Sequence, residues 1–230
     1  MKSHNTHSRR KFLGNIAAGT AVGLSMIANP IEAKINETFL KDEGVNFAEL
    51  DIKLKKIGKM QHPVAYDVSQ ANWWGFIWSN VYYMTNEETG TSNPDLGVLN
   101  VLRHHGIIFS FKDDVIEKYK LGERFGYNDP TTGKPAVKNP YIDPQEGAFP
   151  LPGLAGIRGL QDQGAMFCVC NMAYKVYSQF ISQDLGITKE EVYNDFVNGK
   201  LPGIDLAPSG VWVLGRLQEN NIGYIDSSVG

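Results

Sequence analysis

Residues 165–185 read AMFCVCNMAYKVYSQFISQDL, and this stretch decides the fold class. Residues 165–170 form a compact apolar run of the length typical of a buried strand. Residues 172–185 carry apolar side chains at helical spacing, so a helix is expected directly after the strand. A buried strand that leads straight into a helix is typical of α/β proteins with a parallel sheet.

The same alternation recurs along the chain. Strands are predicted at 62–69, 96–102, 165–170 and 222–225. One more strand, before the last of these, is expected to end at 206–208. Helices are predicted at 47–57, 72–84, 112–121, 154–162, 172–185, 189–197 and 211–220. Thr188 and Ser209 are expected to cap the last two helices, and Gly122 to end the helix at 112–121. We therefore predict a three-layer α/β sandwich, with a mostly parallel five-stranded sheet and helices on both faces.

The N-terminal segment resembles a twin-arginine export signal. Residues 8–14 read SRRKFLG, and a soft apolar run with three glycines follows at 13–28. A membrane span needs about 20 strongly apolar residues, which this run does not supply. We expect residues 1–33 to be a removable signal peptide, cleaved after Ala33 or Ala28, and the protein to be periplasmic.

The remaining chain suits one domain. A helical extension is expected at 34–61 and the α/β domain at 62–230, with a proline-rich insert at 125–156 that covers a site or another subunit. The chain has a formal charge of −3, and the signal carries more cations than carboxylates, so the rest is acidic. We expect no nucleic-acid partner and no stable membrane insertion after processing.

Ligands of parallel α/β sheets bind at the carboxyl ends of the strands, which nominates residues without any motif. The candidate thiol is Cys170, at the junction of a strand and a helix. A helix N-terminus favours the nucleophilic thiolate, although free cysteines are also common as small buried hydrophobes. The candidate binding residues at the strand ends are Trp73, Arg103, His104, His105, Asn171 and Ser209.

Each binding candidate has a structural alternative. Arg103 could hold an anion or a persulfide, or pair with a carboxylate. His104 and His105 could supply a general base, or hydrogen-bond to a loop. Ser209 has no base assigned and is expected to cap a helix. Trp73 belongs to an aromatic segment that is more often a core or a subunit interface.

The pair Cys168 and Cys170 is not expected to form a disulfide. Alternate residues of a strand lie about 6.6–6.8 Å apart, so the bond would be strained. A soft metal ion would need further sulfur or nitrogen ligands, and the adjacent His104 and His105 point to opposite faces of a strand. We expect no metal and no other cofactor, with a metal site kept as a third alternative.

Residues 164–173, GAMFCVCNMA, resemble the strand-to-helix junction of DsrE/DsrF-like proteins, and the order of elements from 62 to 225 is similar. The stretches VLRHHGIIFSFKDDVIEKYKLGE, DPTTGKPAVKNPY and APSGVWVLGRLQENNIG resemble exported, uncharacterised members. The better-known relatives are cytoplasmic sulfur-relay oligomers that carry a persulfide on the cysteine after the third strand. The resemblance implies an acceptor thiol at Cys170 and a homo-oligomer.

Two functions therefore stand side by side. In the first, an exported protein binds or transfers sulfur through Cys170, with small sulfur species as partners. In the second, a non-enzymatic periplasmic protein uses the same fold to bind a small molecule or to assemble. This chain differs from the cytoplasmic relatives in three features, which are its expected export, the insert at 125–156 and the additional Cys168.

Overall fold

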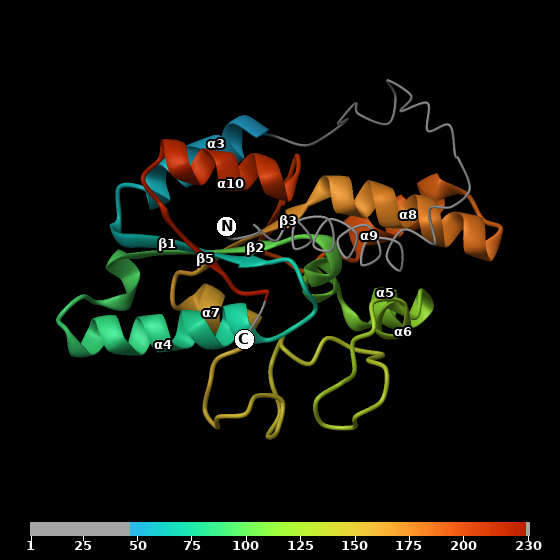
Figure 1. Ribbon diagram of the computed structural model, residues 1–230, viewed down its shortest axis with the longest axis horizontal. Coiled ribbons are helices and arrows are strands. Elements are labelled where there is room, and N and C mark those ends of the chain that lie inside the picture. Colours follow the sequence, from blue (N-terminus) through green and yellow to red (C-terminus); the bar gives the residue numbers. More distant parts are fainter. Residues whose placement is uncertain (1–46, 229–230) are drawn as a thin grey trace, which may run out of the picture. The chain divides into compact units, whose positions relative to one another are not determined.

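The computed structural model describes residues 47–228, so the predicted signal peptide and residues 34–46 lie outside the described part. A five-stranded parallel sheet forms its centre, in the order β4-β3-β2-β1-β5 (Figure 1). Its strands are β1 (Gln61–Val68), β2 (Leu96–Leu102), β3 (Met166–Cys170), β4 (Ile204–Ala207) and β5 (Gly223–Asp226). The predicted fold class is confirmed, and every strand pair is parallel.

Helices cover both faces of the sheet, which makes three layers (Figure 1). One face carries α3 (Phe47–Ile57) and α10 (Gly210–Glu219). The other face carries α4 (Trp74–Glu88) and α7 (Ile157–Asp162), with the short 3₁₀ turn η1 (Asn93–Asp95) leading into β2. The sequence predicts a peripheral extension at α3. The helix instead belongs to the same layer as α10, because its Leu50, Leu54 and Ile57 are buried.

The pleat of the strands divides the interior into two cores. In β1, Tyr66 and Val68 face the larger core under α4, whereas Ala65 faces the smaller core under α3 and α10. The smaller core consists of Leu50, Leu54, Ile57, Ala65, Leu99, Val101, Cys168, Ala207, Val213, Leu217 and Ile222. Side chains of successive strand residues point to opposite faces, so β1, β2, β3 and β4 each contribute to both cores, whereas the residues of β5 are exposed.

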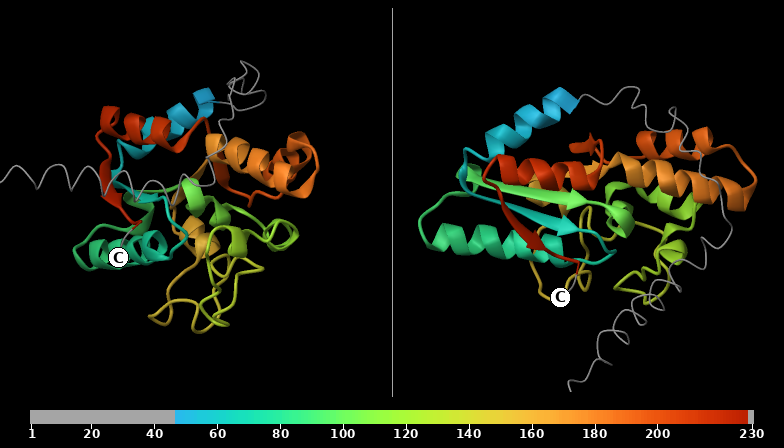
Figure 2. Two further views of the ribbon diagram at one scale, coloured as in Figure 1. Left: turned by 45° about the vertical axis from the view of Figure 1, so that its right-hand side comes forward. Right: turned by 45° about the horizontal axis from the view of Figure 1, so that its top comes forward.

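The carboxyl end of the sheet is covered by further helices. A 3₁₀ segment, η2 (His104–Ser110), follows β2 directly and is followed by α5 (Asp113–Lys118) and α6 (Leu121–Arg124). Helices α8 (Asn171–Leu185) and α9 (Lys189–Asn198) form a hairpin that projects beyond this end of the sheet (Figures 1 and 2). The sequence did not predict η2, which encloses the edge where a ligand site was expected.

Capping residues set several of the helix ends. Thr188 accepts a hydrogen bond from the Glu191 N–H at 3.2 Å, as expected at the start of α9. Ser209 does the same for the Trp212 N–H at 3.1 Å at the start of α10. Gly186 ends α8 in the left-handed conformation, with φ of 67°. These local rules place the helix boundaries that the sequence predicts.

The helix predicted at 112–121 is divided into α5 and α6. Lys120 is left-handed, with φ of 50°, and interrupts the helix. Gly122 does not end a helix but lies within α6, where an added Cβ would meet the Ala136 carbonyl oxygen at 2.2 Å. The backbone of the insert thus packs closely against α6. The sequence predicts a single helix because its apolar spacing carries no sign of this contact.

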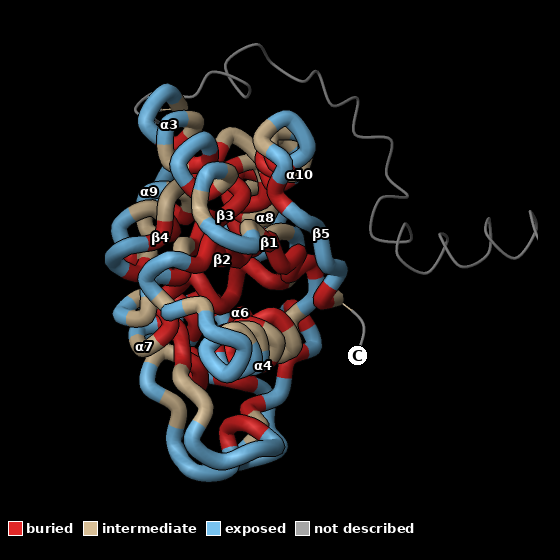
Figure 3. Tube along the Cα trace, turned by 90° about the vertical axis from the view of Figure 1, so that its left-hand side faces the viewer, coloured by how far each residue is buried: buried red, intermediate tan, exposed pale blue. Residues whose placement is uncertain are grey.

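The proline-rich insert is held by aromatic side chains. Tyr127, Tyr141 and Phe149 are buried, and Tyr141 packs against Phe76 and Phe109 with ring centroids 5.3 Å from each. The Tyr127 hydroxyl donates to the Tyr141 hydroxyl at 2.8 Å. Much of the rest of the insert is exposed (Figure 3). Within residues 47–228, the search for membrane-spanning helices finds none of sufficient length and apolarity.

The contact between Gly106 and β1 gives a stability prediction. A Cβ at Gly106 would lie 2.1 Å from the Val68 carbonyl oxygen, so Gly106→Ala must displace η2 from the strand. We expect a loss of about 2 kcal/mol in the free energy of unfolding, as for other overpacked sites. Gly215→Ala is the matched control, because nothing lies within 4 Å of that Cβ and the site is helical.

Urea denaturation measures both variants. We expect Gly215→Ala to raise the free energy of unfolding by about 0.5–1 kcal/mol, because alanine is the better helix former. Equal stability of Gly106→Ala and the unmodified protein would show that η2 does not pack against β1 as described.

Candidate functional site

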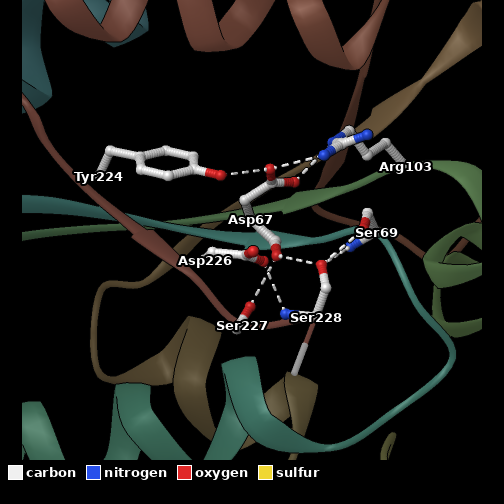
Figure 4. Close-up of polar contacts among 7 residues, drawn as sticks. All are labelled: Asp67, Ser69, Arg103, Tyr224, Asp226, Ser227 and Ser228. Atoms are coloured by element: carbon white, nitrogen blue, oxygen red, sulfur yellow. Dashed lines mark hydrogen bonds and ion pairs between the residues drawn. The ribbon is translucent and has the colours of Figure 1, made fainter. Parts of the chain in front are cut away.

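Two groups of side chains lie at the carboxyl ends of the strands. The first, the Asp67 cluster, comprises Asp67, Ser69, Arg103, Tyr224, Asp226, Ser227 and Ser228 (Figure 4). The second, the Cys170 cluster, comprises Cys170, Tyr177, which lies within electrostatic reach of the sulfur, and the rings that pack against Tyr177, namely His104, His105 and Phe125. Arg103 and His104 are adjacent in sequence but belong to different clusters. The strand-end rule thus finds two sites with different chemistry.

An ion pair forms the centre of the Asp67 cluster. The Asp67 side chain is fully buried at the end of β1. Arg103 donates from Nε to one carboxylate oxygen at 2.7 Å and from Nη2 to the other at 2.8 Å. The Tyr224 hydroxyl donates to the second oxygen at 3.0 Å. This bidentate geometry is the strong form of an arginine–carboxylate contact.

The backbone of Asp67 is bound by the C-terminal segment. Its carbonyl oxygen accepts from the Ser227 N–H at 3.1 Å and from the Ser227 hydroxyl at 2.9 Å. Ser228 continues the link through its hydroxyl, which contacts Ser69 at the end of β1. The cluster therefore joins β1 to β2 and to the chain that follows β5 (Figure 4).

Because the Asp67 carboxylate is buried, Arg103 serves as its ion-pair partner. Its hydrogen bonds to Asp67 raise the pKa of the Arg103 guanidinium, although burial acts in the opposite direction. An unpaired carboxylate at the Asp67 position would lose its hydration without compensation, which is costly. Of the two roles considered from the sequence, the structure shows Arg103 paired with a carboxylate.

Cys170 is both the last residue of β3 and the N-cap of α8. Its Sγ accepts a hydrogen bond from the Ala173 N–H at 3.3 Å. Helix α8 is 15 residues long, so the positive end of its dipole lies at this sulfur. The residue is 8% exposed, at the margin of the larger core. A thiol in this position is polarised and accessible only to small reagents.

Cys168 has a different environment from Cys170. It lies in the smaller core under α3 and α10, and burial raises the pKa of its thiol well above the ordinary value. Both cysteines are free thiols. Among residues 47–228, no group of three or more histidine, cysteine or acidic side chains is arranged to hold a metal ion.

Aromatic and imidazole rings form the rest of the Cys170 cluster. His105 stacks on Phe125 with centroids 4.9 Å apart, and Phe125 packs against Tyr177 at 4.7 Å. His104 and His105 do not lie on opposite faces of a strand, as the sequence predicts, but in η2 with ring centroids 4.1 Å apart, and His104 lies 6.1 Å from Tyr177. Burial, and then the charge of Cys170, raise the pKa of Tyr177 to about 12, so this ring lies within electrostatic reach of the sulfur.

The two imidazoles are neutral at neutral pH. Burial, and then His104, lower the pKa of His105 to about 4. Burial and Arg103 also lower the pKa of His104, against a hydrogen bond with the Ser69 backbone that raises it. His104 adopts a left-handed backbone with φ of 50°, a conformation that carries strain in a non-glycine residue. Imidazoles whose pKa is lowered in this way are weak proton acceptors near neutral pH.

The remaining candidates have structural contacts. The Asn171 side chain is buried, and its oxygen accepts from the Tyr193 hydroxyl at 2.8 Å, which joins α8 to α9. Ser209 caps α10, as described above. Trp73 packs partly buried at the start of α4, and its indole N–H has no hydrogen-bond partner within residues 47–228. These three residues lie outside both clusters.

A pocket of about 490 Å³ lies away from the strand ends, between the insert and α5 and α7. Its charged groups largely bind one another or the insert backbone. Arg158 binds Asp143 at 2.5 Å, Asp113 accepts the Asn139 N–H at 2.9 Å, and Asp129 accepts the Thr131 N–H at 2.8 Å. These contacts stabilise the insert, and the pocket contains no residue of either cluster.

Comparison with models of known protein families, with curated proteins and with solved structures finds no match for this chain. The fold and the two clusters are therefore interpreted from the residues themselves.

Sequence reasoning missed Asp67, Tyr224, Phe125 and Tyr177. Asp67 carries a signal, because a carboxylate within the apolar run VAYDV must find a buried partner. Tyr177 follows Cys170 by seven residues, which places both on one side of α8. Phe125 and Tyr224 reach their clusters through tertiary contacts and carry no comparable local signal.

The pKa of His105 predicts the pH dependence of stability. The folded pKa of about 4 lies below the ordinary value of 6.5, so the unfolded chain binds a proton first as pH falls. The contribution of His105 to stability is complete above pH 6.5 and is lost as pH falls towards 4. We expect His105→Phe, which keeps a ring against Phe125, to reduce this decline.

Urea denaturation at several pH values tests this prediction. The control is His62→Phe at the exposed start of β1, which should leave the decline as it is. An unchanged slope in His105→Phe would contradict the assignment of a buried neutral imidazole.

Proposed function

We propose that this chain is an exported thiol protein in which Cys170 accepts and passes on sulfane sulfur from small sulfur species. The position of the Cys170 Sγ at the N-terminus of α8, where it accepts the Ala173 N–H, carries the proposal. The resemblance of residues 164–173 to the DsrE/DsrF-like junction supports the same sulfur. The parallel fold is consistent with that resemblance.

The proposed step is a persulfide transfer without net oxidation. The Cys170 thiolate attacks the terminal sulfur of a donor R–S–SH, and the S–S bond of the donor breaks. The products are the Cys170 persulfide and the donor thiolate R–S⁻, so one sulfur atom moves and the charge is conserved. The positive end of the α8 dipole lies next to the attacking thiolate, and the released R–S⁻ takes up a proton from water.

The surroundings of Cys170 limit the donor to a small molecule. Only 8% of the residue is exposed, and the partly buried Tyr177 lies within electrostatic reach of its sulfur. An inorganic polysulfide or a short thiol persulfide needs no larger opening.

The low exposure of Cys170 also favours a second candidate, a non-enzymatic periplasmic protein that binds a small molecule or assembles. In that function the Cys170 sulfur serves only as a helix cap. Cys170→Ser would then preserve the cap through its hydroxyl and leave every property unchanged.

Alkylation of the folded protein tests the thiol. With iodoacetamide at pH 6, we expect one modification per chain, at Cys170, located by mass spectrometry. Cys168→Ser should react as fast as the unmodified protein, because Cys168 is sealed in the smaller core. Cys170→Ser should lose at least about 90% of the modification, since only a thiolate is nucleophilic. Modification of Cys170 only after unfolding would rule out the sulfur-transfer proposal.

A separate experiment tests export. Replacing Arg9 and Arg10 together by lysine keeps the charge and removes the motif, so the chain should remain in the cytoplasm with residues 1–33 attached. Cell fractionation with intact-mass analysis measures both properties. Lys2→Arg is the control and should be exported normally. Normal export of the double variant would contradict a twin-arginine signal.

A further inference from the structure

We propose that the protein forms a two-fold dimer in which β5 pairs antiparallel with β5 of a second copy, with Ile225 at the axis. The inference does not depend on Cys170. It follows from the open edge of the sheet, the apolar surface beside that edge and the charges that the pairing brings together.

The edge at β5 is open. Within the described part of the chain, β5 pairs with β1 alone, and all four of its residues are exposed. The strand lies at the margin between α10 and α4, with no described element outside it (Figures 2 and 3). Backbone N–H and C=O groups on the outer side of an edge strand are free to pair with another strand. A β-strand is therefore the partner that fits.

The opposite edge of the sheet, at β4, is protected. Ile204 and Ala207 are buried there, and Asp205 binds Lys53 of α3 at 2.7 Å. Lys200 adds a hydrogen bond to the Ile204 carbonyl. One open edge per chain allows a closed pair of copies, whereas two open edges would lead to longer assemblies.

An apolar surface accompanies the open edge. Ile225 is 37% exposed and lies in register with Tyr66 of β1, on the α4 face of the sheet. The Tyr66 ring contacts Trp78 and Tyr82, each with centroids 6.4 Å apart, and both of these rings are only half-buried. A second copy would cover this surface and bring the two Ile225 side chains together.

The register follows from symmetry and charge. A two-fold axis perpendicular to the sheet keeps side chains on their own face, so Ile225 at the axis opposes itself and Tyr224 opposes Asp226 of the second copy. Asp226 is the one charge of β5, and this register places it opposite a tyrosine rather than another carboxylate.

Sedimentation velocity of the full chain tests the assembly. We expect a dimer, and we expect Ile225→Lys to raise the dimer dissociation constant at least about tenfold, because it places two ammonium groups at the axis. Ile52→Lys is the matched control, since Ile52 is 66% exposed on α3, and should remain dimeric. A monomer, or a dimer equally stable in Ile225→Lys, would overturn the proposal.

Disulfide crosslinking tests the register. Directly opposed residues of antiparallel strands have Cα atoms about 4.5–5.5 Å apart, which suits a disulfide. Ile225→Cys should therefore crosslink into a covalent dimer under mild oxidation, whereas Ile52→Cys should not. A dimer in which Ile225→Cys fails to crosslink would show that another surface forms the interface. If β5 instead pairs with a strand of a different protein, the purified chain would be monomeric. Either result would overturn the proposal.

Discussion

The buried carboxylate of Asp67 holds the carboxyl end of the sheet together. Asp67 is fully buried at the end of β1 and is bound by Arg103, which follows β2, and by Tyr224 from β5. A charge in such a place is tolerated only when its partners are fixed, since removing one partner leaves an uncompensated ion. Arg103 is thereby fixed in position, and η2 begins at the next residue, His104. The ion pair thus lies one residue before the histidines of the Cys170 cluster.

Sequence reasoning predicts the elements better than their long-range contacts. The alternation of apolar runs with helical spacing predicts the parallel sheet, and Thr188 and Ser209 cap helices as expected because caps are local. The division of α5 from α6 depends on the insert backbone beside Gly122, which no local pattern contains. The partners of Asp67 come from residues far along the chain, so the sequence could indicate only that a partner was required.

The candidate site shows the same division between local and long-range information. Strand alternation predicts that Cys168 and Cys170 share a face, yet the two sulfurs lie in different cores because Cys170 already begins α8. That double role brings the sulfur to the positive end of a helix and separates it from Cys168. The rings around it reach the site from η2, the start of the insert and α8. A partly sealed thiol at a helix N-terminus is consistent with exchange of single sulfur atoms.

The central claim is that Cys170 carries sulfur, and the intact mass of the protein isolated from its native compartment tests it most directly. The account predicts an added mass of about 32 Da per chain, that of one sulfur atom, lost on reduction and absent from Cys170→Ser. An unmodified mass in protein isolated without reductant, before and after exposure to polysulfide, would contradict the account.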